Sequence, residues 1–212
     1  MRIALIHALR HSPPPIEEAF ARLWPGCSLM NLLDDSLSAD LARDGALTDA
    51  ITQRFLVLAR YALDTGADAI LFTCSAFGPC IRACKEAWPT VPILAPNEAM
   101  IAEVATPGRR VGLLASFRAT LATMPSEFPD TVTVVPCFAP GALAALDRGD
   151  LAEHDRLAAS AAASALADCD VIALAQFSLA RAAHAVAVAT GKPVFTTPDS
   201  AVRQLRLLLH AN

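Results

Sequence analysis

ADAILFTCSAFGPCIRACKEAWPTVPILAPNEAM, residues 67–100, is the stretch that decides the fold. Its apolar run Ala69–Phe72 predicts a short buried strand, and small polar residues then lead into a helical pattern. A second apolar run, Val91–Leu94, follows and ends in the turn Ala95–Asn97. Strand, helix and strand in this order predict one parallel crossover unit.

The residues that follow the first of these strands form a candidate site. In open parallel sheets, ligands bind outside the carboxyl ends of the strands, where Thr73, Cys74 and Ser75 are expected to lie. A thiol at a helix N-terminus meets backbone N–H donors and the positive end of the helix dipole, which favour the thiolate. We therefore interpret Cys74 as the catalytic candidate, with an inert buried thiol as the alternative.

Composition excludes several classes of protein. Of 212 residues, 54% are hydrophobic and 18% charged, and the net charge of −4 is spread without a basic stripe, so nucleic acid is not an expected partner. No apolar run approaches the roughly 18 residues of a membrane-spanning helix. A strand-like run follows Arg2 without a cleavage site, so no secretory signal is expected.

Cysteine usage gives the expected compartment. Six cysteines without a signal are typical of reduced thiols in a cytoplasmic protein. Cys74, Cys80 and Cys84 match no zinc spacing, and Cys80 and Cys84 fall on one helical face as small buried residues do, so no metal site is expected. A redox role for Cys74 and Cys80 is an open alternative.

The chain repeats its own pattern. The strand-like run Arg2–Ile6 recurs as Arg110–Ala115, and Asp68–Phe72 recurs as Asp170–Ala175, with the tripeptide Gln176–Ser178 following where Thr73–Ser75 followed before. We predict two α/β lobes with parallel sheets, formed by residues 1–97 plus 198–212 and by residues 98–197. The two strand-end tripeptides would then face one cleft. Further predicted elements are helices over 16–23, 46–64, 98–105, 151–167, 179–190 and 199–210 and strands over 28–32, 131–136 and 193–195.

Other polar residues fall at predicted strand ends. His7 and Ser12 follow the first strand, and we expect them at the same sheet edge as Cys74, although a structural histidine is an equal alternative for His7. Asn97 lies after a strand and before a helix, where it caps the helix or contacts a substrate. Cys137, just beyond the strand predicted over 131–136, is a weaker candidate to line the cleft.

Several stretches together resemble the aspartate/glutamate/hydantoin racemase superfamily, which includes arylmalonate decarboxylase and maleate isomerase. They are GADAILFTCSAFGP (66–79), RRVGLLASFRATL (109–121), GDLAEHDRLAASAA (149–162) and CDVIALAQFSLARAA (169–183), the last running on to PVFTTPDSAV (193–202). The resemblance implies two pseudo-symmetric Rossmann-like (flavodoxin-like) lobes, no organic cofactor and no metal. It also implies a small carboxylate-bearing substrate in the inter-lobe cleft, and a homo-oligomer.

The sequence departs from the racemase pattern at one position. In the racemases two cysteines, one per lobe, flank the carbon next to the carboxylate; Cys74 matches the first, but Gln176 occupies the second position. An amide cannot take or give the proton. The arylmalonate decarboxylase also keeps a single thiol, but in the second lobe.

Other residues of the expected cleft would bind the substrate. Charge that develops on the substrate carboxylate needs hydrogen-bond donors. Thr73, Ser75 and Ser116 offer hydroxyl groups, and Arg118 offers a bidentate clamp or is an exposed first-turn arginine. Gln176 and Ser178 would complete the opposite wall.

These observations predict a cofactor-independent racemase or isomerase that acts at the carbon alpha to a carboxylate, with Cys74 as the single thiol of the cleft. The alternatives are a one-thiol decarboxylase and a protein that binds small acids without turnover.

Overall fold

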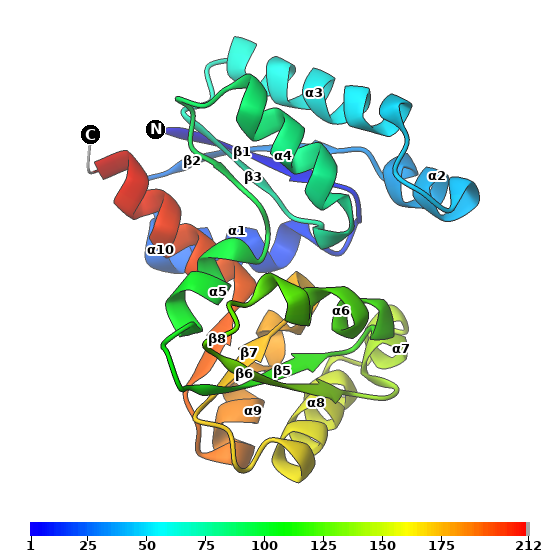
Figure 1. The fold of residues 1–212 in the computed structure, drawn as a ribbon, viewed down its shortest axis with the longest axis vertical. Coiled ribbons are helices and arrows are strands. Elements are labelled where there is room, and N and C mark those ends of the chain that lie inside the picture. The colour runs from blue at the N-terminus through cyan, green and yellow to red at the C-terminus, as the bar shows by residue number, and fades with distance from the viewer. Residues whose placement is uncertain (211–212) are drawn as a thin grey trace. The chain divides into compact units, whose positions relative to one another are not determined.

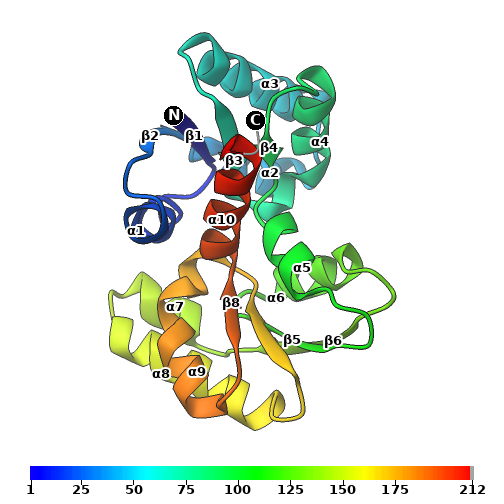
Figure 2. The same cartoon turned by 90° about the vertical axis from the view of Figure 1, so that its left-hand side faces the viewer.

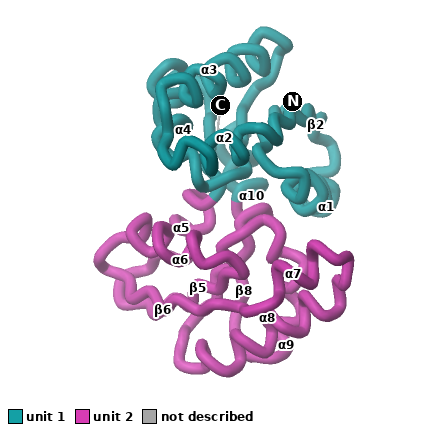
Figure 3. The backbone as a smooth tube through the Cα atoms, turned by 90° about the vertical axis from the view of Figure 1, so that its right-hand side faces the viewer, with its two compact units in different colours: residues 1–96, 201–212 teal, residues 97–200 magenta. Residues whose placement is uncertain are grey.

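The computed structural model describes residues 1–210 and divides the chain into two compact units. The first comprises residues 1–96 together with the chain from residue 201, and the second comprises residues 97–200. Figure 3 shows the two units in different colours. The chain passes from one unit to the other twice, after Pro96 and after Ser200. The first unit is therefore built from two separate segments of the sequence.

The first unit is a four-stranded parallel sheet with strand order β2-β1-β3-β4 and helices on both faces (Figure 1). Its elements are β1 (Arg2–His7), α1 (Pro13–Leu23), β2 (Ser28–Leu33), α2 (Ser36–Asp44), α3 (Asp49–Asp64), β3 (Ala69–Phe72), the 3₁₀ turn η1 (Ser75–Phe77), α4 (Gly78–Ala87), β4 (Ile93–Leu94) and, from Ala201, the greater part of α10 (Thr197–His210).

The second unit has the same topology, with strand order β6-β5-β7-β8 and all pairs parallel. Its elements are α5 (Glu98–Val104), β5 (Arg110–Ala115), α6 (Arg118–Thr123), η2 (Met124–Glu127), β6 (Thr133–Phe138), α7 (Ala142–Asp147), α8 (Leu151–Ala165), β7 (Val171–Leu174), η3 (Phe177–Ala182), α9 (Ala183–Thr190) and β8 (Val194–Thr196). The predicted fold class, α/β with two parallel sheets, is confirmed.

The internal repeat extends to individual hydrogen bonds. The backbone N–H of Arg2 donates to the Asp68 carboxylate at 2.7 Å, and that of Arg110 donates to Asp170 at the same distance. Ile6 pairs with Phe72 as Leu114 pairs with Leu174, and Cys74 and Gln176 each follow two residues later. Cys74 and Gln176 therefore occupy equivalent positions in the two units.

Alternation along the strands divides the side chains between two faces of each sheet. In the first unit, Ala4, Ile6, Ile70 and Phe72 pack in one apolar cluster with α3 and α4. In the second unit, one cluster includes residues of α8 and α9 and another includes residues of α5. The positions of these helices can be followed in Figure 2. Strands buried on both faces read as continuous apolar runs, which is why RIALI, AILF, RVGLLA and DVIALA were readable as strands.

Helix α10 packs in the first unit beside the end of α1. The guanidinium of Arg206 donates to the Leu23 carbonyl at 3.1 Å, and the rings of His210 and Trp24 lie 5.5 Å apart. Its buried residues Val202 and Leu205 belong to the core. The last described helix thus helps to cover this part of the sheet.

Several predicted boundaries were wrong. Helix α2 was not predicted; its N-cap is Asp35, and Asp34 before it accepts hydrogen bonds from the N–H and the hydroxyl of Ser36. Helix α7 was not predicted. Helix α1 starts at Pro13, three residues early, since proline is compatible with the first helical turn. Strand β6 is shifted to Thr133–Phe138, which places Cys137 inside the strand.

In residues 1–210, no helix combines the length and the apolar character that crossing a membrane requires.

Candidate active site

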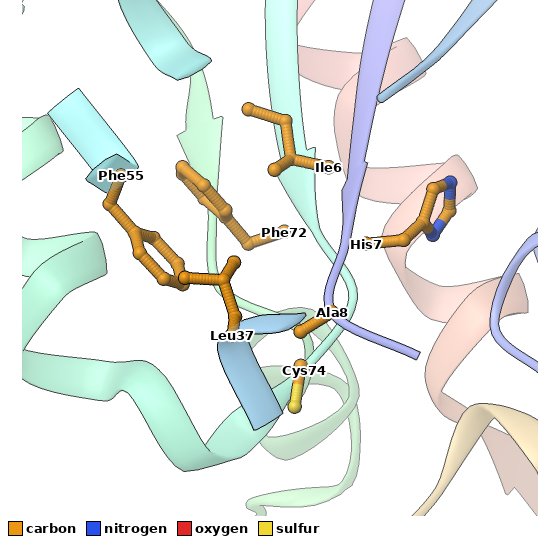
Figure 4. Close-up of a pocket in the computed structure, with 7 residues that line it drawn as sticks. All are labelled: Ile6, His7, Ala8, Leu37, Phe55, Phe72 and Cys74. Carbon is orange, nitrogen blue, oxygen red and sulfur yellow. The ribbon is translucent and has the colours of Figure 1, made fainter. Parts of the chain in front are cut away.

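Cys74 lies at the carboxyl end of β3, immediately before η1. Its side chain is on the α3 face of the sheet and packs against the cluster that includes Phe55, Phe72 and Leu37, as Figure 4 shows. The residue as a whole is only partly buried. The seven residues drawn there leave no room for a water molecule between them, so a substrate cannot reach the sulfur through this cluster.

The expectation that Cys74 is a thiolate is not confirmed. Burial raises the pKa of the Cys74 thiol above its usual value of 9.0, and the backbone N–H of Ala76 opposes that shift without cancelling it. Because η1 has only three residues, Ser75–Phe77, few aligned peptide dipoles are available to oppose the effect of burial. At neutral pH the sulfur therefore carries its proton.

His7 and Thr73 are hydrogen-bonded to each other and point to the sheet face opposite Cys74. The His7 ring is fully buried, and its Nδ1 lies 2.9 Å from the Thr73 hydroxyl. Strand alternation places both side chains on that face, and Figure 4 shows the ring directed away from the cysteine. His7 therefore forms no dyad with Cys74 in this arrangement.

The other ring nitrogen of His7 contacts a residue that the sequence analysis missed. Its Nε2 lies 2.9 Å from Oδ1 of Asn31 on β2, and Nδ2 of Asn31 donates to Glu17 of α1 at 2.7 Å. Burial lowers the pKa of His7, while the bond to Asn31 and the negative charge of Glu17 raise it less. The signal in the sequence was a single polar residue within the otherwise apolar run Leu29–Leu33.

Ser12 and Ser75 occupy different environments. Ser12 is buried next to the start of α1, and its backbone N–H donates to the Leu9 carbonyl at 3.2 Å. Ser75 is exposed at the first position of η1, directly after Cys74. Of these two hydroxyl groups, only that of Ser75 is both next to the thiol and open to solvent.

In the second unit, Gln176 and Ser116 form the equivalent strand-end site. Oε1 of Gln176 accepts from the backbone N–H of Ser116 at 2.7 Å and from its hydroxyl at 3.1 Å. A backbone N–H can only donate, so the atom that faces it must be the amide oxygen. The Gln176 side chain is therefore fixed with its NH₂ group, a donor, on the other side.

Arg118, Ser178 and Asn97 also belong to the second unit. The Arg118 guanidinium lies over the Phe138 ring, 4.0 Å from its centroid, so a first-turn arginine is held at the strand-end edge of the sheet. Ser178 is half-buried in η3, two residues after Gln176. Asn97 is buried and does not cap α5 with its side chain; it is hydrogen-bonded to the Glu127 carboxyl, whose pKa burial nevertheless raises.

Two of the other cysteines, Cys80 and Cys137, are buried inside elements of the structure. Cys137 is buried in β6, with its sulfur 3.5 Å from the Ala161 carbonyl of α8, so the weaker prediction that it lines a cleft is not supported. Cys80 is buried in α4, 3.4 Å from the Thr52 hydroxyl. Within residues 1–210, no three His, Cys, Asp or Glu side chains gather as metal ligands do.

Comparison with known proteins gives both a family and a fold. The family model described as Asp/Glu/Hydantoin racemase matches residues 15–205. An allantoin racemase from Klebsiella pneumoniae has a similar structure, with a TM-score of 0.75 and 16% identity over 100% of this chain and 88% of that one.

Two further structures show the same fold. A glutamate racemase from Francisella tularensis subsp. tularensis SCHU S4, solved in complex with D-glutamate, gives a TM-score of 0.70 and 16% identity over 100% of this chain and 81% of that one. An unliganded arylmalonate decarboxylase gives 0.67 and 20% over 97% and 91%. No curated protein matches the sequence.

Proposed function

Because the chain belongs to the Asp/Glu/hydantoin racemase family, we propose that it is a cofactor-independent enzyme of racemase or isomerase type. It acts at the carbon alpha to a carboxylate of a small acid or amino-acid derivative, and Cys74 is its catalytic thiol. The proposal includes the expectation from the sequence that one substrate contacts the strand-end residues of both units.

The observation that carries this proposal is the equivalence of Cys74 and Gln176. The two residues follow equivalent strands at equivalent register, so only one of the two repeats supplies a titratable group at this position. Cys74, once deprotonated, takes the alpha proton, and the electrons of the C–H bond move into the substrate carboxylate. Gln176 cannot return a proton on the other face, but its fixed NH₂ group can donate to a substrate oxygen.

The remaining strand-end groups supply donors for the developing charge. The exposed hydroxyl of Ser75 and the guanidinium of Arg118 are of the type that binds a carboxylate. In the absence of a second thiol, the proton returns from Cys74 itself or from solvent. We therefore expect exchange of the alpha proton to be faster than inversion of configuration.

The protonated state of Cys74 favours a second candidate, a one-thiol decarboxylase. Burial keeps the thiol protonated at neutral pH, which suits a group that gives a proton. In that reaction the bond between the alpha carbon and one carboxylate breaks, carbon dioxide leaves, and the resulting carbanion takes the sulfur-bound proton. A similar fold is found in an arylmalonate decarboxylase.

One experiment separates these candidates. Amino acids, hydantoins and disubstituted malonates are incubated with the protein in D₂O, and deuterium at the alpha carbon, optical purity and carbon dioxide are measured. Racemase or isomerase chemistry incorporates deuterium and erodes optical purity without carbon dioxide. Decarboxylation releases carbon dioxide and leaves one deuterated enantiomer.

The role of Cys74 is tested with a matched pair of variants. Cys74→Ser should lower the rate by at least about 10³-fold, whereas Cys27→Ser, which changes another partly buried free thiol, should leave it unchanged. Equal activity of the two variants would contradict the proposal. If no substrate reacts and Cys74→Ser binds acids as the parent does, the protein is a binding protein instead.

A further inference from the structure

Four residues of the first unit, three of them in β1, β2 and α1 and one directly after β3, form one continuous hydrogen-bonded series. Thr73 follows β3, His7 ends β1, Asn31 lies in β2 and Glu17 in α1. The successive distances are 2.9 Å, 2.9 Å and 2.7 Å. The series therefore crosses three strands and one helix and ends at the residue preceding Cys74.

The direction of each bond follows from the chemistry of the groups. The Glu17 carboxylate only accepts, so the Asn31 atom that faces it is the NH₂ group and the amide oxygen faces His7. That oxygen also only accepts, so His7 must carry a hydrogen on Nε2. A neutral ring then has a bare Nδ1, which accepts the hydrogen of the Thr73 hydroxyl.

A competing acceptor for the Thr73 hydroxyl is available but less favourable. The Ile6 carbonyl lies 3.3 Å from Oγ1 of Thr73 and already accepts the Thr73 backbone N–H at 3.1 Å. The 2.9 Å contact to an unoccupied nitrogen is the better bond while the ring is neutral. Burial of the ring favours that neutral state.

We propose that Glu17, Asn31 and His7 form a hydrogen-bond relay in which each bond has one direction and the Thr73 hydroxyl donates its hydrogen to His7. Thr73 and His7 therefore position Cys74 and do not bind the substrate. The relay holds the end of β3 against β1 at the residue before the thiol. The inference rests on the proposed function only for the role of Cys74; the hydrogen-bond directions do not depend on it.

The tautomer of His7 is the direct test. Nitrogen-15 NMR of the labelled protein at pH 7 should show Nε2 protonated and Nδ1 bare, and His7→Gln identifies the signal. A ring with hydrogen on Nδ1, or a doubly protonated ring, would overturn the proposal. This measurement needs no substrate, so its failure is distinct from failure of the proposed function.

A charge-shift variant tests the direction of the relay. The double substitution Asn31→Asp with Glu17→Gln removes the carboxylate from position 17 and places one at position 31, in hydrogen-bond contact with Nε2 of His7. The ring should then be doubly protonated at pH 7, and its Nδ1–H should donate to Thr73. The new positive charge lies on the ring that is hydrogen-bonded to Thr73, the residue before the thiol, and it should favour the thiolate. Alkylation of Cys74 by iodoacetamide at pH 7 should therefore become several-fold faster. An unchanged ring state would contradict the proposal.

The kinetic test uses Asn31→Leu, which removes the acceptor of the relay. A positioning role predicts at least a tenfold lower kcat with KM within twofold of the parent, and Asn31→Ile should behave in the same way. A raised KM with unchanged kcat would instead assign Thr73 or His7 to the substrate and overturn the proposal. Thr65→Val is the control, because it removes the hydrogen bonds from the Thr65 hydroxyl to the Tyr61 and Ala62 carbonyls, which are not part of the relay. It should change neither kcat nor KM.

If no reaction is found for the protein, alkylation replaces kinetics as the readout. Asn31→Leu should change the rate at which Cys74 reacts with iodoacetamide by at least threefold, and Thr65→Val should not. Equal rates in the parent and both variants would show that the relay does not position the thiol.

Discussion

At the scale of single residues, the pKa of the Cys74 thiol determines how the reactivity of that thiol depends on pH. Burial raises its pKa above 9.0, so the reactive thiolate increases as the pH rises through and beyond that value. Alkylation of Cys74, followed by mass spectrometry in the Cys27→Ser background, should accelerate about tenfold per pH unit from pH 7 to 9. An alkylation rate that does not change between pH 7 and pH 9 would contradict this prediction.

Gln176 gives a second prediction at this scale. Gln176→Glu keeps an oxygen to accept from Ser116 N–H but replaces the NH₂ donor with negative charge. Affinity for a carboxylate substrate should fall at least tenfold, which corresponds to about 1.4 kcal/mol. Isothermal titration calorimetry measures it, with Gln204→Glu on α10 as the control for added charge. Undiminished affinity would place the carboxylate away from Gln176.

At the scale of elements, Gly112 allows α8 to approach β5 closely. A Cβ added there would lie 2.9 Å from a methyl carbon of Leu166, just beyond the helix end. Gly112→Ala should therefore destabilise the protein by about 1–3 kcal/mol in urea unfolding. Gly26→Ala is the matched control, because no atom lies within 4 Å of its added Cβ. In the Leu166→Ala background the effect of Gly112→Ala should be smaller, and equal effects in both backgrounds would exclude the clash.

The segment between β2 and α3 depends on Arg54. Its guanidinium pairs with Asp34 and Asp40 and also contacts Ser36. Burial raises the pKa of Asp34, but the bonds from Ser36 and Arg54 outweigh it and hold the pKa below its usual range. This stabilisation is present above the unfolded pKa of 3.8 and is lost as the pH falls below it.

Arg54→Met should consequently cost about 1 kcal/mol at pH 7 and less at pH 3. Urea titrations at the two pH values measure the difference. A loss of stability that is the same at both would show that packing, not charge, accounts for the effect.

The elements also show how far sequence reasoning extends. Ala69–Phe72 and Arg110–Ala115 were predicted to the residue because strands buried on both faces have no polar interruption. Helix α2 was missed because its N-cap residue Asp35 makes no side-chain capping bond, and the bonds that Asp34 accepts from Ser36 are also typical of a turn. The relay through Asn31 could not be predicted, because the contacts among residues 7, 17, 31 and 73 depend on the strand order and register, which the sequence does not specify.

At the scale of the whole molecule, His7 contributes to the pH dependence of stability. Burial, opposed by Asn31 and Glu17, lowers its pKa below 6.5, so the unfolded chain binds more protons than the native one between the two values. The free energy of unfolding should therefore increase as the pH rises from the lowered pKa of native His7 towards 6.5. His7→Gln should flatten this slope in urea titrations from pH 5 to 7. A slope as steep as in the parent would assign it to other groups.

The division of the first unit between two stretches of chain has a consequence for biosynthesis. Residues 97–200 leave the ribosome as one uninterrupted run, so the second unit has all its strands before the first has its final helix. Until α10 emerges, the carbonyl of Leu23 lacks its bond from Arg206 and the indole of Trp24 lacks its neighbour. A nascent chain that is stalled after residue 200 plus a linker long enough to span the exit tunnel should accordingly resist protease in residues 97–200 and be cleaved in residues 1–96.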